Sequence, residues 1–563
     1  MPPARGESCS TSGRAAAPRV LRGSLARRPN PPGQPRGETL APGALPGGGF
    51  AREAARRASA AALSALLALG SAAPPAWAAA APPRGPPSPP AAAPAPPGVP
   101  AEFPPLAELR PAAYTRTKLK NGLVVYLFED HEVPLLRGTL VFRGGSRVEP
   151  AGLTGVTQLM AAVQRSGGSE GHPGARLEEA LDELAARVET NTSESATSVG
   201  FECLPEDRGR VLPLFFEVAT APAFPEDKLG LVQTQALDSI AHRNDSAGGI
   251  PARELRKLLY GPLSPYARLA SAASVKAVTR GDLVAYHDAW QRPDLAYLGI
   301  VGDFDAREMR AEVEALFGPW RPAEGQPRAP PKVPPAPVPY LAPGAAPGAG
   351  PAKRAAPPSD PAPIYLVNKP GAATATVAFG ELGVRVTDRD AASLDVANTM
   401  LSSFGGRLFT EVRSKRGLAY SVSGRWNMEA TYDGTFVVTA SSDRPAQLIA
   451  RAQEVLQGLV DEVPPREEVE RAKGQALNSF AFNFSSVPAQ MARVVSYDLY
   501  GLPPDFLTKV QRDIQRVTPE SVHRAVRAHL HLSRQPIVVV GDAAKIRKDL
   551  EALGRPIVPL RPE

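Results

Sequence analysis

The sequence predicts an α+β fold built from two similar domains, each a mainly antiparallel sheet covered by helices. Two observations support this prediction. Short strings of residues recur at nearly constant spacing in the two halves of the chain that follow the Pro-rich N-terminal region, and such self-similarity indicates an internal duplication. In each half, strand patterns with turn signals come first, long helical patterns follow, and an apolar strand closes the half, as in an α+β domain.

Residues 1–78 have the features of an export signal with a long N-terminal extension. Arg56-Arg57 precede the apolar run Ala58–Leu69, and Ala76-Trp77-Ala78 fits a small-residue cleavage site. The apolar run is too short to span a bilayer. We therefore expect an exported protein, periplasmic or secreted, without a membrane span. An Ala/Pro-rich leader with no targeting role is the alternative interpretation.

The charge and the cysteines exclude several classes of function. Residues 1–57 contain ten Arg and only three Glu, so the formal net charge of +7 belongs to this leader and the remainder is neutral. Nucleic-acid binding requires a basic face, and none is predicted. The two cysteines are Cys9, in the leader, and Cys203. A processed chain with one cysteine forms neither an internal disulfide nor a thiolate metal site.

Composition divides the rest of the chain. The Pro/Ala-rich residues 79–110 predict an extended tether, and the similar stretch 321–362 predicts an interdomain linker. The predicted domains are therefore 111–320 and 363–563. The strings that they share are QALDS at Gln235–Ser239 with QALNS at Gln475–Ser479, LYG at Leu259–Gly261 with Leu499–Gly501, and VGD at Val301–Asp303 with Val540–Asp542.

The expected elements follow the same order in both domains. In the first domain we expect strands at Thr117–Phe128 with a turn at Asn121-Gly122, then Leu136–Phe142, Arg187–Thr192, Thr197–Glu202 and Leu295–Val301, and a long helix at Pro225–Arg243. In the second we expect strands at Ile364–Val367, Thr374–Phe379, Ala419–Trp426, Gly434–Ala440 and Gln535–Val540, and a long helix at Pro465–Phe482.

One stretch of the second domain combines several functional residue types. In Phe404–Gly424, a glycine pair opens a short predicted helix and Gly417 ends it before an alternating strand. Arg413 and Tyr420 would then point toward one place. From the residues alone, an ion pair of Arg413 with Glu411 and packing of Tyr420 in the sheet is the simpler interpretation.

Three segments resemble the pitrilysin/insulinase family of zinc peptidases, which includes mitochondrial processing peptidase. They are LKNGLVVY at Leu119–Tyr126, FPEDKL at Phe224–Leu229 and GRLFTEVRSKRGLAYSV at Gly406–Val422. The likeness extends from about Thr115 to the C-terminus. It implies a duplicated metalloprotease-like fold, with a zinc site on a first-domain helix carrying His-x-x-Glu-His.

The residues that this zinc chemistry requires are missing. Two imidazoles one helical turn apart bind zinc, and the Glu beside them takes a proton from the metal-bound water. The matching helix, Gly152–Met160, has Gly155, Gln158 and Leu159 at these positions. The family's third ligand falls within Leu231–Ile240, where Asp238 is the one carboxylate. We therefore expect a degenerate site with no metal and no catalytic residue in this chain, and no activity of the chain alone.

Other histidines offer no replacement in the sequence. No His pair has i, i+4 spacing on a predicted helix with a carboxylate between. His529-Leu530-His531 could clamp a metal at a helix end, although a surface pair is the simpler interpretation.

The resemblance also implies substrate-binding positions. In the family, an Arg and a Tyr that match Arg413 and Tyr420 face the zinc site and hold the substrate backbone, with Arg416 as a second candidate for the Arg. The family lays its peptide along the strand that matches the segment around Glu189 by strand addition. Here Glu189 replaces the family's usual Asn.

These features give three hypotheses. The first is a non-catalytic subunit of an exported two-chain zinc peptidase, whose partner carries His-x-x-Glu-His and the zinc, and in which this chain closes the chamber and binds peptide. The second is a peptide-binding or structural scaffold without a role in proteolysis. The third is an autonomous metallopeptidase with an unrecognised metal site.

Overall fold

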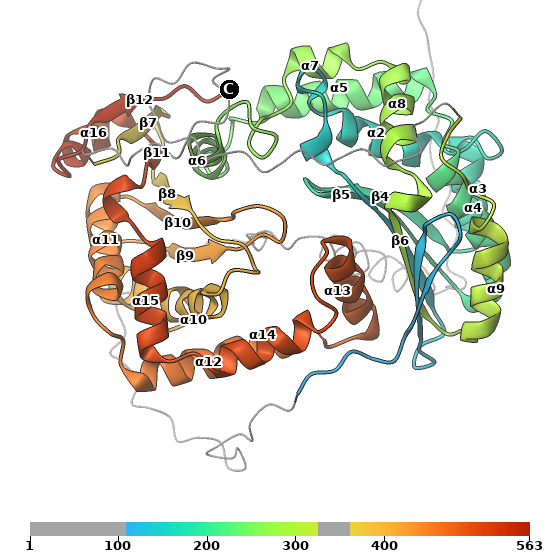
Figure 1. The fold of residues 1–563 in the computed structure, drawn as a ribbon. Coiled ribbons are helices and arrows are strands. Elements are labelled where there is room, and N and C mark those ends of the chain that lie inside the picture. The colour runs from blue at the N-terminus through green and yellow to red at the C-terminus, as the bar shows by residue number, and fades with distance from the viewer. Residues whose placement is uncertain (1–107, 325–360, 483) are drawn as a thin grey trace, which may run out of the picture. The chain divides into compact units, whose positions relative to one another are not determined.

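The computed structural model describes residues 108–324, 361–482 and 484–563. The predicted leader and most of the predicted tether and linker lie outside the described residues. The described chain forms two sheets of six strands each, with helices packed on them (Figure 1).

The first sheet has the spatial order β1-β2-β6-β3-β5-β4, and its pairs are antiparallel except β2 with β6. Its strands are β1 (Thr115–Lys118), β2 (Val124–Glu129), β3 (Leu136–Arg143), β4 (Arg187–Thr192), β5 (Ala196–Cys203) and β6 (Ala296–Gly302). The helices of this half are α2 (Val156–Gly167), α3 (Gly174–Glu183), α4 (Arg208–Thr220), α5 (Glu226–His242), α6 (Ile250–Tyr260), α7 (Ala272–Ala277), α8 (Arg280–Trp290) and α9 (Ala306–Phe317).

The second sheet has the order β12-β7-β11-β8-β10-β9, with β7 parallel to both β11 and β12. Its strands are β7 (Ile364–Asn368), β8 (Ala375–Leu382), β9 (Ser421–Asn427), β10 (Thr435–Ser442), β11 (Ile537–Gly541) and β12 (Ile557–Pro559). The helices are α10 (Ala391–Ser402), α11 (Pro445–Asp461), α12 (Arg466–Phe482), α13 (Val487–Leu499), α14 (Phe506–Gln515), α15 (Pro519–His529) and α16 (Ala543–Glu551).

The predicted fold class is confirmed. Five strands correspond in order between the sheets, from β2 and β7 at one side to β4 and β9 at the other. The sixth strand differs, because β1 comes from the start of its half and pairs antiparallel, whereas β12 comes from the C-terminal end and pairs parallel. The domain limits 111–320 and 363–563 stay a prediction.

Alternation along the strands builds a separate core for each half. On β3, Leu136, Leu140 and Phe142 are fully buried and pack with apolar residues of α3, α4 and α9. In the second half, Trp426 and Phe436 lie 4.4 Å apart between ring centroids and pack with residues of α10, α11, α12 and α15. Period-two burial on the strands and one apolar side on each helix account for both cores.

One helix of each half packs on the sheet of the other half. Helix α6, from the first half, packs on β8 and β11, where Leu255 and Leu259 join a cluster with Val538. Helix α13, from the second half, packs on β2 and β6, and a Cβ added at Gly299 would lie 2.9 Å from Sδ of Met491. The two helices are corresponding parts of the duplication, since both end in the shared Leu-Tyr-Gly string.

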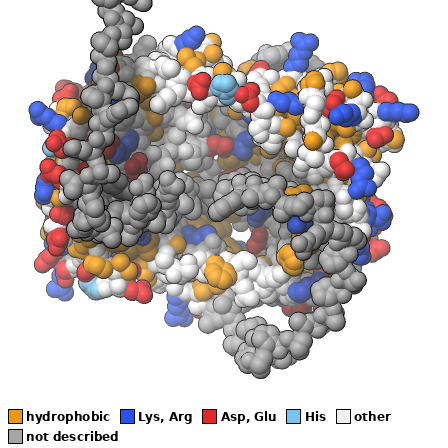
Figure 2. Space-filling view, turned by 180° about the vertical axis from the view of Figure 1, so that it is seen from behind, with side chains coloured by type: hydrophobic (Ala, Val, Ile, Leu, Met, Phe, Trp, Pro, Cys, Tyr) orange, Lys and Arg blue, Asp and Glu red, His pale blue; other side chains and the backbone are white. Residues whose placement is uncertain are grey.

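None of the helices within the described residues is long and apolar enough to cross a membrane. On the part of the reverse face that is described, Lys and Arg side chains are interspersed with Asp and Glu (Figure 2).

Candidate functional site

A cavity of about 1100 Å³ is lined by elements of both sheets. The first half contributes the N-terminal end of α2, the end of β4 and the loop before α7, and the second half contributes α10, the end of β9 and parts of α12 to α14. The α12–α14 side includes the aromatic residues Phe480, Tyr497 and Phe506 beside the charged residues Arg493, Lys509 and Asp513. The other sides are also lined by charged side chains of both signs, among them Glu149, Glu194, Glu429, Arg256, Arg268 and Arg425.

The helix expected at Gly152–Met160 begins later than predicted. Residues Ala151–Leu153 form a short 3₁₀ turn, and α2 starts at Val156 because Gly155 has a left-handed backbone with φ of 104°. The buried carboxylate of Glu149 accepts hydrogen bonds from the backbone N–H groups of Gly155 and Thr157, both at 2.9 Å. Burial raises the pKa of Glu149, although these hydrogen bonds and the charge of Arg268 oppose the shift.

The residues at the family's metal positions do not fit zinc. A side chain at Gly155 would place its Cβ 3.0 Å from Cβ of Ala270, in a backbone conformation that L residues rarely adopt. Gln158 lines the cavity but is neither a base nor a ligand of zinc sites. Leu159 is 2% exposed and belongs to the apolar cluster around α2. On α5, the side chain of Asp238 is 76% exposed and lies 3.6 Å from His242.

The outer strands β4 and β9 differ in how their free edges are satisfied. On β9, the hydroxyl of Ser402 bonds both backbone groups of Gly424, at 2.7 and 2.8 Å. The carboxamide of Asn398 bonds both backbone groups of Trp426, at 2.7 and 3.0 Å. Helix α10 therefore closes this edge. On β4, no described group outside β5 bonds the backbone, so its edge is available for strand addition.

Side chains hold α2 beside the open edge without occupying it. The hydroxyl of Thr190 on β4 donates to the carbonyl of Ala161 on α2 at 2.6 Å. Glu189, which stands where the family has Asn, lies 3.7 Å from Arg165 of α2, and Arg165 also bonds Glu178.

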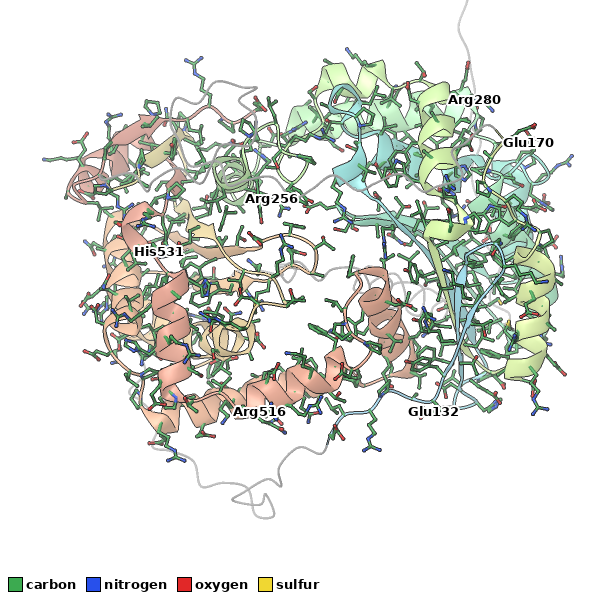
Figure 3. All side chains as sticks on the ribbon, viewed as in Figure 1. Glu132, Glu170, Arg256, Arg280, Arg516 and His531 are labelled. Atoms are coloured by element: carbon green, nitrogen blue, oxygen red, sulfur yellow. The ribbon has the colours of Figure 1, made fainter. Side chains whose placement is uncertain are left out.

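A polar network joins the halves at the cavity. Glu194, in the β4–β5 turn, accepts from Arg256 of α6 at 2.5 Å and from the hydroxyl of Tyr432 at 2.7 Å (Figure 3 labels Arg256). Burial raises the pKa of nearby Glu429 to about 7, the charge of Glu194 adds to the rise, and Arg256 opposes it. Glu429 is thus a cavity carboxyl whose charge changes near neutral pH.

Arg413 and Tyr420 are not among the residues that line this cavity. Arg413 lies on the π-helical turn Phe409–Ser414, and Tyr420 lies just before β9. Cζ of Arg413 is 4.9 Å from the ring centroid of Phe409 and 5.5 Å from that of Tyr420, so the guanidinium stacks over both rings. The packing interpretation is wrong, because Glu411 pairs with Lys415 and Arg451 and Tyr420 is 84% exposed. The substrate-binding role of Arg413 and Tyr420 stays a prediction.

The histidine pair at the end of α15 divides between two acids. His529 bonds Asp390 at 3.1 Å, and His531 bonds Glu381 at 2.8 Å. Ligand atoms of Asp388, Asp390 and His529 lie within 4.8 Å of one another. Two guanidinium groups, of Arg389 and Arg524, lie 3.8 Å from Asp390 and would repel a cation, so we assign this cluster to ion pairing.

Comparison with known proteins gives two family matches. Residues 125–253 match the model described as insulinase, peptidase family M16, and residues 277–476 match the model described as the peptidase M16 inactive domain. The chain belongs to peptidase family M16. As an inactive-type member of this insulinase/pitrilysin family, it is consistent with a non-catalytic role.

Individual M16 relatives are distant in sequence but similar over most of their length. The non-peptidase homolog YmxG of Helicobacter pylori is 22% identical over 447 residues, covering 78% of this chain and 96% of that protein. An uncharacterized zinc protease of Rickettsia bellii is 23% identical over 367 residues, covering 64% and 81% respectively.

Solved structures show the same fold. The peptidase M16 inactive domain from Pseudomonas fluorescens has a TM-score of 0.64 at 24% identity, covering 80% of this chain and 99% of that one. A protease from Helicobacter pylori has a TM-score of 0.66 at 16% identity, covering 77% and 100%.

Sequence reasoning missed the groups that shape the first-half wall of the cavity. Glu149 and Arg268 lie outside every motif, and no spacing in the sequence connects them with α2. A Glu a few residues before a helix is a weak signal for an N-terminal cap and could have identified Glu149. Nothing in the sequence distinguishes Arg268.

Proposed function

We propose that this chain is the non-catalytic subunit of an exported two-chain zinc peptidase, in which it closes the chamber and helps to bind the peptide substrate. One observation carries the proposal. The cavity wall formed by α2 has no ligand or base at Gly155, Gln158 or Leu159, whereas the adjacent edge of β4 is open to a peptide strand. A homologous partner with His-x-x-Glu-His would supply the zinc ion and the general base.

The exposed segment around Arg413 fits a contribution to a site outside this chain's own cavity. The guanidinium of Arg413 stacks on the rings of Phe409 and Tyr420 and forms no ion pair with a described residue. Its N–H groups are therefore available to donate hydrogen bonds to a ligand. The phenol of Tyr420 is exposed beside this guanidinium. In the proposed complex these donors hold the peptide carbonyls and stabilise the charge that develops on one of them.

The test is activity of the chain alone, of the partner alone and of their mixture on a quenched fluorescent peptide. We expect turnover in the mixture only. Arg413→Ala or Tyr420→Phe should then lower kcat about 100- to 1000-fold, as expected for loss of an oxyanion donor, with assembly unchanged in size-exclusion chromatography. Arg416→Ala, on the same segment, serves as the comparison. Zinc-dependent cleavage by this chain alone would overturn the proposal.

The second candidate is a peptide-binding or structural scaffold outside proteolysis. It is favoured by the relative in Helicobacter pylori that is named a non-peptidase homolog and matches over 96% of its length. Isolation of the chain from its native host distinguishes the two. A co-purifying chain with His-x-x-Glu-His supports the peptidase pair, and a complex without such a chain supports the scaffold.

A further inference from the structure

Arg268 occupies a specific place between the open strand edge and the start of α2. Arg256 ties the loop of Arg268 to the β4–β5 turn, because it donates to the carbonyl of Tyr266 and to the carboxylate of Glu194. Farther along the same loop, Ala270 packs against Gly155. Arg268 therefore lies where β4 ends and α2 begins.

Three polar side chains between the end of β4 and the start of α2 have donors or acceptors that no described residue satisfies. Arg268 donates to the backbone carbonyl of Glu149, but its Nε is buried without a partner, and it makes no ion pair with a described residue. The hydroxyl of Thr192, the last residue of β4, is also buried and has no hydrogen-bond partner among the described residues. The carboxamide of Gln158 is exposed and has no hydrogen bond to a described residue. All three residues line the cavity.

We propose that Arg268, with Gln158 and Thr192, binds a carboxylate of a peptide that lies along β4. A guanidinium offers a fork of donors that matches a carboxylate, and a charge-assisted bond of this kind is stronger than one to a neutral carbonyl. The carboxylate of Glu149 is engaged by the backbone N–H groups of Gly155 and Thr157. Nη2 of Arg268 donates to the carbonyl of Glu149, and Nη1 has no bond to a described residue and is left for a ligand. The inference rests on the proposed peptide-binding role and specifies the substrate class.

The carboxylate has two possible sources, the C-terminus of the peptide or an acidic side chain. The probe is a fluorescein-labelled eight-residue peptide of alternating Val and Thr in three forms, namely the free acid, the C-terminal amide, and the amide with Glu as its last residue. Fluorescence anisotropy measures binding to the full chain. We expect at least one acidic form to bind about ten-fold or more tightly than the plain amide, and which form does so identifies the source.

Variants locate the contact. Arg268→Gln should remove the preference for the acidic form while leaving the affinity for the plain amide unchanged, and Arg268→Lys should retain part of it. Gln158→Ala, on an exposed helix position, should reduce the preference without a change in the thermal unfolding midpoint, and remains informative if Arg268→Gln fails to fold. Arg493→Gln removes an equal charge from the cavity lining on α13 and should keep the preference.

Equal affinity of the native chain for all three forms would overturn the carboxylate inference and leave peptide binding intact. Loss of the preference in Arg493→Gln but not in Arg268→Gln would also overturn it. Absence of binding in all three forms would count against the peptide-binding role itself.

Discussion

At the residue scale, the backbone conformation of Gly155 opposes the introduction of a zinc ligand at this position. Its φ of 104° and the 3.0 Å approach to Ala270 oppose any side chain there, and a non-Gly residue in a sparsely populated backbone region costs roughly 1–3 kcal/mol. Leu159, at the second ligand position, is buried in the cluster around α2. Replacing the residue types is therefore not enough to restore the geometry.

We predict that the triple variant Gly155→His, Gln158→Glu, Leu159→His binds no stoichiometric zinc. The first His would be displaced by Ala270, and the second would place a polar ring in an apolar cluster. The measurement is zinc per chain by mass spectrometry after dialysis against zinc, with circular dichroism to follow folding. Gln158→Glu alone is the control for folding. One zinc per folded chain would contradict the prediction.

Glu429 should make stability depend on pH near neutrality. Its pKa rises from the ordinary 4.5 to about 7 in the folded chain, so the folded state binds the proton more tightly than the unfolded state does. The stabilising contribution is complete below pH 4.5 and is lost as the pH rises through 7. The full span corresponds to roughly 3 kcal/mol as an upper value.

The variant Glu429→Gln removes this titration. Its free energy of unfolding, measured by urea denaturation, is compared with that of the native chain at each pH. The difference, variant minus native, should increase by roughly 2 kcal/mol from pH 5 to pH 8. Glu132→Gln, on the exposed turn between β2 and β3, is the surface control. A difference between Glu429→Gln and the native chain that stays constant over this range would contradict the shift.

At the scale of elements, α10 closes β9 at Trp426 through one buried amide, as Ser402 does at Gly424. Asn398 is buried and bonds both backbone groups of Trp426, so Asn398→Ala leaves a buried donor and a buried acceptor unpaired, at about 1–3 kcal/mol. We predict a loss of stability of that size and faster hydrogen exchange at the Trp426 amide.

Thr399→Ala is the matched control on the same helix, because the hydroxyl of Thr399 bonds the carbonyl of Asp395 within α10. Unchanged exchange at Trp426 in Asn398→Ala would show that the strand edge does not depend on the amide. The two edges would then not differ as we infer.

The sequence predicted the elements well where the pattern is local. The strand expected at Arg187–Thr192 is β4 with the same bounds, and the helix expected at Pro225–Arg243 is α5 within one residue at each end. Alternation and turn residues decide such segments without reference to distant parts of the chain.

Features that depend on contacts between distant residues were not predictable in this way. The observed start of α2 differs from the predicted one because the conformation of Gly155 depends on Glu149 and on Ala270 in a later loop. The loop that carries Arg268 is held by a hydrogen bond from Arg256 to the carbonyl of Tyr266, and no periodicity of the sequence predicts that contact. For the same reason no local pattern indicates that the edge of β4 is open and that of β9 is closed.

At the scale of the whole described chain, the exchanged helices α6 and α13 make the two sheets mutually dependent. The surface of β2 and β6 is covered by apolar residues of α13, which belongs to the other half of the sequence. Across the same contact, Asp498 of α13 accepts from Arg116 at 2.8 Å and from the hydroxyl of Tyr126 at 2.5 Å. Removing α13 from this place would expose apolar strand residues to water.

We therefore predict that a destabilising substitution in α13 increases hydrogen exchange in the sheet of the other half. Leu499 is 2% exposed, and Leu499→Ala should lower the free energy of unfolding by about 2–5 kcal/mol. Hydrogen exchange measured by mass spectrometry should rise in β2 and β6, which are distant from Leu499 in the sequence, because the helix that covers them is held less tightly. Leu456→Ala on α11 is the control, since that residue is equally buried but belongs to the core of the second half. It should raise exchange in the second sheet and leave β2 and β6 unchanged. If Leu499→Ala raised exchange only within the second half, the two sheets would be independent units.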